Sequence, residues 1–271
     1  MKADKIFLSD EESQNAEDNT QRLADIMDIF YSVIRVAALT PKSLNEPGPG
    51  EKLAIGIFGM FLKTILADLR SVHVLVSIGY PLSAATVASS LWEKSVMGRF
   101  ILKSPGQRIQ TYFEHPSKKK LPWDMKSMLL ELIVENDPAT KAKAVDLYYV
   151  QFTYLCSLKH PQAETISKAS ELHFDQSRSM ELIPGKPSDS RGLNFLILAQ
   201  ALYSTLEYMN FAVPMFCKSD LVNVCTHLSG KLGRLCFADN LTLQVPPEFQ
   251  LRPGDVSPEA WEHLRNFWSS K

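Results

Sequence analysis

The sequence predicts an all-α protein, an irregular multi-helix bundle with long antiparallel helices and minor extended segments. Alternation of apolar and polar residues, the pattern of a half-buried strand, is nearly absent. We expect extended structure only near residues 173–185 and 241–250, and no internal repeat is visible. Apolar residues instead recur at helical spacing over four long stretches, residues 20–40, 51–103, 138–159 and 192–236.

The N-terminal region is predicted to be a tail followed by a helix. Residues 1–19 are acidic and polar, so we expect them to form a disordered tail. Asn19 or Thr20 is placed to cap the next helix, because their side chains can accept a hydrogen bond from its first turn. Pro41 ends that helix.

A helical hairpin is predicted next. Its two helices span about residues 51–78 and 81–103, and Gly79 marks the turn between them. Pro81 suits the first turn of the second helix, because the N–H that proline lacks has no partner there. The segment Ser104-Pro105-Gly106 ends the hairpin.

The rest of the chain is predicted as shorter helices and loops within one helical domain over residues 20–240. Residues 241–271 are expected to add an extended segment and a C-terminal helix packed on that domain. The helices expected after the hairpin span about residues 108–114, 125–135, 138–159, 161–172, 192–217 and 220–236.

Composition places few limits on function. The formal net charge of −1 gives no overall field that would attract nucleic acid or anionic lipid. We see neither the apolar core of a signal peptide nor an apolar run of ~20 residues, so we expect no membrane span and a cytoplasmic location. We predict no metal and no cofactor. Four widely spaced cysteines are expected to be reduced and buried, namely Cys156, Cys217, Cys225 and Cys236.

Ionisable side chains lie on or beside the apolar stripes of three predicted helices. Arg70 and His73 lie on the first helix of the hairpin, Glu93 on the second, and His160 at the end of a later helix that also carries Tyr154. A buried charge must be paired, hydrogen-bonded or used. We therefore predict ligand-binding residues Arg70, Glu93, Tyr154 and His160, with catalytic candidates Glu93, His160 and His73. A structural network that fixes helix register is the alternative.

The same region carries a resemblance. Its features are an arginine-bearing helix, a glycine turn, a small-residue stretch before a glutamate, and a later aromatic-rich helix. Over roughly residues 50–215 the chain resembles an uncharacterised, mainly bacterial all-α family of unknown function. Ser89-Ser90 stand where that family usually has a second arginine. The resemblance implies a helical fold and no established activity. The matching positions are Arg70, Gly79, Ala84-Ala85, Glu93 and the run YLCSLKHP from Tyr154 to Pro161.

A second pattern lies in RIQTYFEH, where Arg108 and His115 have the spacing of the R-x(4–6)-H motif of HEPN-type ribonucleases. In that chemistry a histidine transfers a proton at the RNA 2′-hydroxyl, and an arginine stabilises charge on the phosphorane. Lys118-Lys119-Lys120 and Trp123 would then hold the phosphate backbone and stack on a base. A solvated basic loop is the favoured alternative.

Three classes of function therefore remain. The favoured one is a regulatory or interaction protein, monomeric or homodimeric, whose polar cluster is structural or binds a small ligand. The second is a HEPN-like metal-independent ribonuclease or toxin-type effector, the only class with a nucleic-acid partner. The third is a hydrolase or transferase that uses Glu93, His73 and His160. We find no zinc-protease helix, phosphate-binding glycine loop or serine nucleophile elbow in the sequence.

Overall fold

A computed structural model describes residues 10–48, 50–115, 122–158, 173–174, 180–181 and 191–237. The protein is all-α, as predicted, and β1 (His173–Phe174) and β2 (Met180–Glu181) add one short antiparallel pair. The described helices are α1 (Asp10–Arg22), α2 (Ala24–Leu39), the 3-10 helix η1 (Thr40–Lys42), α3 (Lys52–Ser77), α4 (Pro81–Lys103), α5 (Pro105–Glu114), α6 (Met125–Leu132), α7 (Pro138–Leu158), α9 (Arg191–Phe216) and α10 (Ser219–Phe237).

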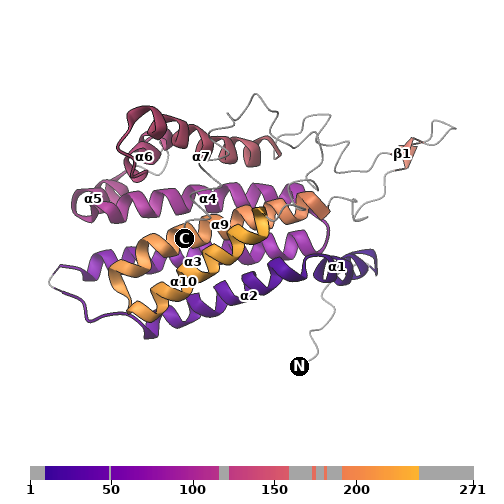
Figure 1. Cartoon of the computed structure of the whole chain (residues 1–271), viewed down its shortest axis with the longest axis horizontal. Helices are drawn as coiled ribbons and strands as arrows, with labels where there is room; N and C mark the ends of the chain where they lie inside the picture. Colours follow the sequence, from indigo (N-terminus) through magenta and orange to yellow (C-terminus); the bar gives the residue numbers. More distant parts are fainter. Residues whose placement is uncertain are drawn as a thin grey trace.

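Helix α4 lies between two groups of helices (Figure 1). Helices α6 and α7 lie on one side of it, and α2, α3, α9 and α10 lie on the other. The arrangement follows from the burial of α4, in which 14 of the 23 residues are buried. A helix that is apolar around most of its circumference has to be covered by neighbours on several sides.

The hairpin of α3 and α4 confirms the sequence prediction. Gly79 has a φ of +91°, a conformation that a side chain disfavours, and it forms the turn. The Tyr80 amide donates to the Leu75 carbonyl at 2.8 Å and closes the end of α3. Pro81 then begins α4, as its lack of an N–H allows.

The contact of α3, α4 and α9 depends on one glycine. A Cβ atom at Gly98 of α4 would lie 2.6 Å from the Tyr208 ring and 3.0 Å from the Phe61 ring. The Tyr208 hydroxyl donates to the Phe58 carbonyl at 2.9 Å, which fixes that ring in the core. The three helices therefore pack against each other at a point where no side chain fits.

The expected N-terminal tail is wrong for residues 10–19, which belong to α1. Asn19 is buried, and its side-chain amide donates to the carbonyls of Val76 at 3.3 Å and Ser77 at 3.0 Å. These carbonyls belong to the last turn of α3 and have no partner within their own helix. Asn19 therefore closes the end of α3 instead of starting the next helix. Residues 1–9 lie outside the described part.

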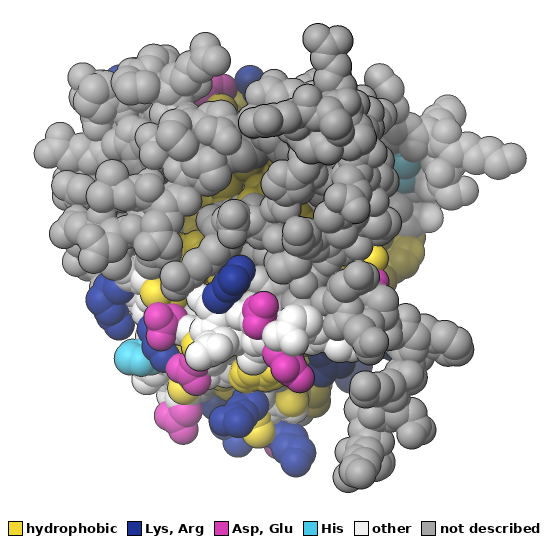
Figure 2. Space-filling view, turned by 90° about the vertical axis from the view of Figure 1, so that its right-hand side faces the viewer, with side chains coloured by type: hydrophobic (Ala, Val, Ile, Leu, Met, Phe, Trp, Pro, Cys, Tyr) yellow, Lys and Arg dark blue, Asp and Glu magenta, His cyan; other side chains and the backbone are white. Residues whose placement is uncertain are grey.

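Several other predictions can be compared. The expected helices over 20–40, 108–114, 125–135, 138–159, 192–217 and 220–236 correspond to α2, α5, α6, α7, α9 and α10, with ends that differ by a few residues. The expected helix over 161–172 and the segment over 241–271 lie outside the described residues. Among the described helices, none is both long enough and apolar enough to span a membrane. On the described part of the face in Figure 2, basic and acidic side chains are interspersed.

Candidate functional site: a polar seam between α4, α7 and α9

Arg70 points away from the partner helix of the hairpin. The face of α3 that meets α4 is marked by Asp68, whose carboxylate is 2.5 Å from the Lys94 ammonium. Successive helical residues are about 100° apart, so Arg70 points roughly 200° away from Asp68. Its side chain is accordingly exposed.

His73 lies on a third side of α3 and faces α2. Its ring stacks on Phe30, with the ring centres 4.3 Å apart and the planes at 10°, and Tyr31 meets it edge-on at 6.0 Å. Burial lowers the pKa of His73, because the charged imidazolium would lose hydration there. This histidine therefore packs as an aromatic side chain against α2.

Glu93 is half-buried on α4. Arg70 is exposed and does not enter the hairpin core. That Glu93 is largely buried there stays a prediction. Tyr154 is half-buried on α7, and burial raises the pKa of its hydroxyl. His160 lies outside the described residues, so its grouping with Glu93 and Tyr154 stays a prediction.

Arg108 is held by contacts within the fold. Its guanidinium lies 3.8 Å from the centre of the Phe100 ring and donates to the Phe100 carbonyl at 2.6 Å. It also forms an ion pair with Glu131 of α6. His115 lies two turns further on, at the residue that follows α5. The contacts of Arg108 fasten α5 to α4 and α6, and the ribonuclease interpretation stays a prediction.

The buried polar cluster is formed by other residues. The guanidinium of Arg99, on α4, forms an ion pair with the Glu207 carboxylate on α9, and both side chains are less than one-fifth exposed. Two tyrosine hydroxyls donate to the second carboxylate oxygen, Tyr203 at 3.1 Å and Tyr148 of α7 at 3.4 Å. The two hydroxyl oxygens are 2.7 Å apart. Four side chains thus join three helices.

Both tyrosines remain neutral. Burial and the negative charge of Glu207 raise the pKa of Tyr203 and of Tyr148 above the ordinary value. Each hydroxyl therefore keeps its proton and acts as a donor. The cluster carries one positive and one negative charge, on Arg99 and Glu207.

Contacts between the helices give their directions. Ser95 donates to the Ser204 carbonyl at 2.7 Å, and Arg99, one turn later on α4, meets Glu207, so α4 and α9 run parallel. Near the start of α4, Trp92 stacks on Phe152 of α7 at 4.8 Å. Further along α4, Arg99 contacts Glu207, which also binds Tyr148, a residue that precedes Phe152 on α7. Helix α7 therefore runs antiparallel to both α4 and α9.

Two glutamines lie on the same two helices as Tyr148 and Tyr203. Gln151 of α7 and Gln200 of α9 each lie about one helical turn from these tyrosines, three residues from Tyr148 and from Tyr203 respectively. Both side-chain carbonyl oxygens are buried and have no hydrogen-bond partner among the described residues. More than ~90% of buried polar groups in proteins are hydrogen-bonded. We call the six residues Arg99, Tyr148, Gln151, Gln200, Tyr203 and Glu207 the polar seam.

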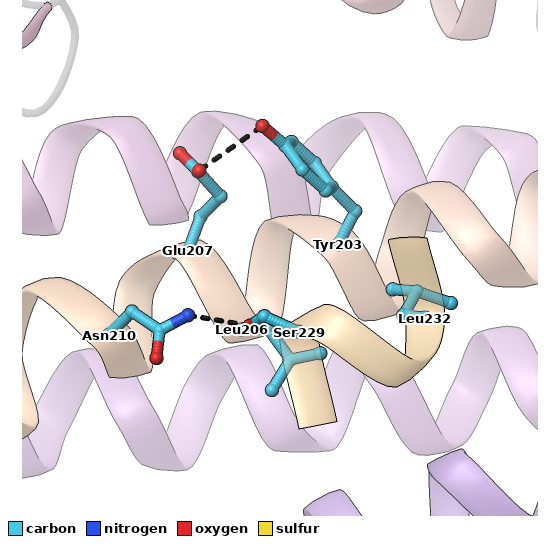
Figure 3. A pocket seen from close by; sticks show the side chains of 6 residues that line it. All are labelled: Tyr203, Leu206, Glu207, Asn210, Ser229 and Leu232. Carbon is cyan, nitrogen blue, oxygen red and sulfur yellow. Dashed lines mark hydrogen bonds between the residues drawn. The ribbon is translucent and has the colours of Figure 1, made fainter. Parts of the chain in front are cut away.

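A small hollow adjoins the polar seam on the side of α10. It is lined by Tyr203, Leu206, Glu207, Asn210, Ser229 and Leu232 (Figure 3). The Asn210 amide donates to the Ser229 hydroxyl at 2.6 Å, while its buried carbonyl oxygen has no partner in the described part of the chain. The hollow has room for no more than about one water molecule.

Comparisons with known proteins do not identify the chain. No family model, no curated protein sequence and no solved structure matches it. Within the described residues, no three histidine, cysteine, aspartate or glutamate side chains are grouped so that they could hold a metal ion.

Sequence reasoning missed the polar seam because its parts are far apart in the chain. Glu207 lies 108 residues from Arg99, and Tyr148 belongs to a third helix. One signal was present: Tyr203 and Glu207 are four residues apart in a strongly apolar helix, so they share a face. Which helix would supply the positive charge to that face could not be read from spacing.

Proposed function

We propose that this protein is a regulatory ligand-binding protein in which a small polar ligand enters the polar seam between α7 and α9. The observation that carries the proposal is the pair of buried carbonyl oxygens of Gln151 and Gln200, which lack donors. A buried carbonyl without a donor costs roughly 1–3 kcal/mol. A ligand that supplies the donors would recover that free energy on binding.

The packing of α7 supports a regulatory role. Only three of its 21 residues are buried, namely Val145, Leu155 and Leu158, whereas most of α4 is buried. An element with few buried apolar contacts opens at low free-energy cost. A ligand held between α7 and α9 would shift the position of α7 to the extent that it binds one position more tightly than the other.

Thermal unfolding of the full chain against a panel of small compounds tests the proposal. The panel contains amino acids, amines, carboxylic acids, sugars, carboxamides and nucleobases. A compound that binds only the folded protein raises its Tm by mass action. We expect at least one class to raise the Tm of the parent protein, and we expect Gln200→Leu to abolish that shift.

The matched control is Gln107→Leu, the same change at an exposed position on α5. This variant should respond to the ligand as the parent does. If no compound raises the Tm, or if Gln200→Leu responds as strongly as the parent, the polar seam is not a ligand site. The network would then serve only to fix the register of α4, α7 and α9.

A further inference from the structure

Helix α1 has no apolar face with which to pack. Of its 13 residues, Ala16 alone is apolar, and Asn19 alone is buried among those of its side chains that the structure describes. A helix of about 12–15 residues is only marginally stable in water without packing. We propose that α1 is a detachable strap, a segment that undocks and unfolds as one unit while the rest of the bundle stays folded. This inference is independent of ligand binding at the polar seam.

Polar contacts hold the strap at the end of the hairpin of α3 and α4. The buried Asn19 amide donates to the carbonyls of Val76 at 3.3 Å and Ser77 at 3.0 Å. Nearer the start of α1, the Tyr80 hydroxyl donates to the Glu12 carboxylate at 2.6 Å, and this contact is exposed to solvent. Each of these hydrogen bonds contributes little net free energy, because water replaces the partner when the bond opens. The strap can therefore undock at low free-energy cost.

Leu23 marks the hinge of the strap. It lies between α1 and α2 with φ −109° and ψ 17°, outside the α-helical region, and its side chain is buried. The chain beyond it is anchored, because α2 buries an apolar face that begins with Ile26 and Met27. In Figure 1, α1 lies beyond the end of α2 and next to the end of α3. Unfolding of α1 can stop at Leu23, where the packed part of the chain begins.

Undocking changes the surface at the end of the hairpin. While α1 is docked, Asn19 covers the carbonyls of Val76 and Ser77 in the last turn of α3. Once α1 leaves, both carbonyls can accept hydrogen bonds from water or from a donor on another molecule. A molecule that binds the undocked form more tightly than the docked form would shift the equilibrium toward undocking. The strap is thus a conformational device at the end of the bundle opposite the 40–51 loop.

Hydrogen–deuterium exchange of backbone amides in the full chain, measured without ligand, tests the proposal. We expect the hydrogen-bonded amides of α1 to exchange at least about 100-fold faster than the buried amides of α4, because α1 opens locally while α4 opens only with the core. We also expect them to exchange at least about tenfold more slowly than an unstructured peptide, because the docked state is the populated one. Equal protection of α1 and α4, or no protection of α1, overturns the proposal.

The variant Asn19→Ala separates docking from helix propensity. Alanine is the better helix former, yet it removes both donors to α3. We expect exchange in α1 to accelerate at least about tenfold, with α4 unchanged.

The matched control is Thr20→Ala. Thr20 is exposed, and its hydroxyl donates to the Ala16 carbonyl of the same helix at 2.6 Å, so this variant should keep the protection of α1. The proposal is overturned if Asn19→Ala leaves exchange in α1 unchanged or accelerates α4 equally. It is also overturned if Asn19→Ala does not fold, because α1 would then belong to the cooperative core.

Discussion

Helix α4 meets α9 in two different ways along its length. At Gly98 the contact is apolar and so close that a methyl group would collide with Tyr208 and Phe61. At Arg99, one residue later, the contact is an ion pair with Glu207 that two tyrosines of α7 and α9 complete. The first contact is filled by carbon atoms, while the second continues into glutamines whose carbonyls lack partners. Close packing accounts for the first contact. At the second contact, the buried glutamine carbonyls carry a free-energy cost that packing does not offset.

The largest expected effect comes from breaking the ion pair. Glu207→Leu should lower the free energy of unfolding by about 3–5 kcal/mol, because Arg99 is left buried without its carboxylate. Chemical denaturation measures the loss. The double variant Arg99→Met/Glu207→Leu should regain most of it, since an apolar pair needs no compensation.

An exposed pair serves as the control for that change. Lys126 and Asp146 lie 3.2 Å apart, and each side chain is more than half exposed. Asp146→Ala should change the free energy of unfolding by less than ~1 kcal/mol. Equal losses for Glu207→Leu and Asp146→Ala would show that the buried pair behaves as a surface pair.

The apolar contact should respond to an added methyl group. Gly98→Ala should cost about 1–3 kcal/mol in the free energy of unfolding, because two rings must move. Gly56→Ala is the matched control, since nothing lies within 4 Å of a Cβ there in the same hairpin. It should stabilise the protein by about 0.5–1 kcal/mol through helix propensity. A neutral Gly98→Ala would mean that the helices are further apart than described.

The comparison also shows what a sequence can predict. The hairpin was predictable because Gly79 and Pro81 act locally, through a positive φ and a missing N–H. Helix α1 was not predictable, because its polar residues carry no apolar stripe, and it is docked through Asn19 on the distant end of α3. The seam required the register of three helices. Helical periodicity places Arg99 and Glu207 on faces of their helices, but only the packing of α4 on α9 pairs them.

A smaller effect is expected from one hydroxyl of the seam. Tyr203→Phe removes the donor to Glu207 and the partner of the Tyr148 hydroxyl. The substitution should lower the free energy of unfolding, measured by chemical denaturation, by about 1–2 kcal/mol. Tyr149→Phe is the control on the same helix, because the Tyr149 ring packs on Phe152 and its hydroxyl makes no described hydrogen bond. A loss as large for Tyr149→Phe would show that the effect is not specific to the seam.

The smallest expected effect concerns His73, outside both contacts. Its pKa is lowered in the folded protein, so between the unfolded value of about 6.5 and the lower folded value the unfolded chain binds more protons. Stability should therefore fall as the pH is lowered through that window. His73→Phe, which keeps the stacking on Phe30, should lose this part of the pH dependence. If the free energy of unfolding depends on pH in the same way for parent and variant, His73 is not the source of this pH dependence.

The central claim is that Gln151 and Gln200 are retained for binding and not for stability. The free energy of unfolding of Gln151→Leu/Gln200→Leu, measured without ligand, tests it most directly. Because both carbonyls are buried without donors, the account predicts that this free energy is unchanged or higher by about 1 kcal/mol. A loss of more than about 1 kcal/mol would show that the two carboxamides make stabilising hydrogen bonds in the free protein, and the polar seam would then be a structural network.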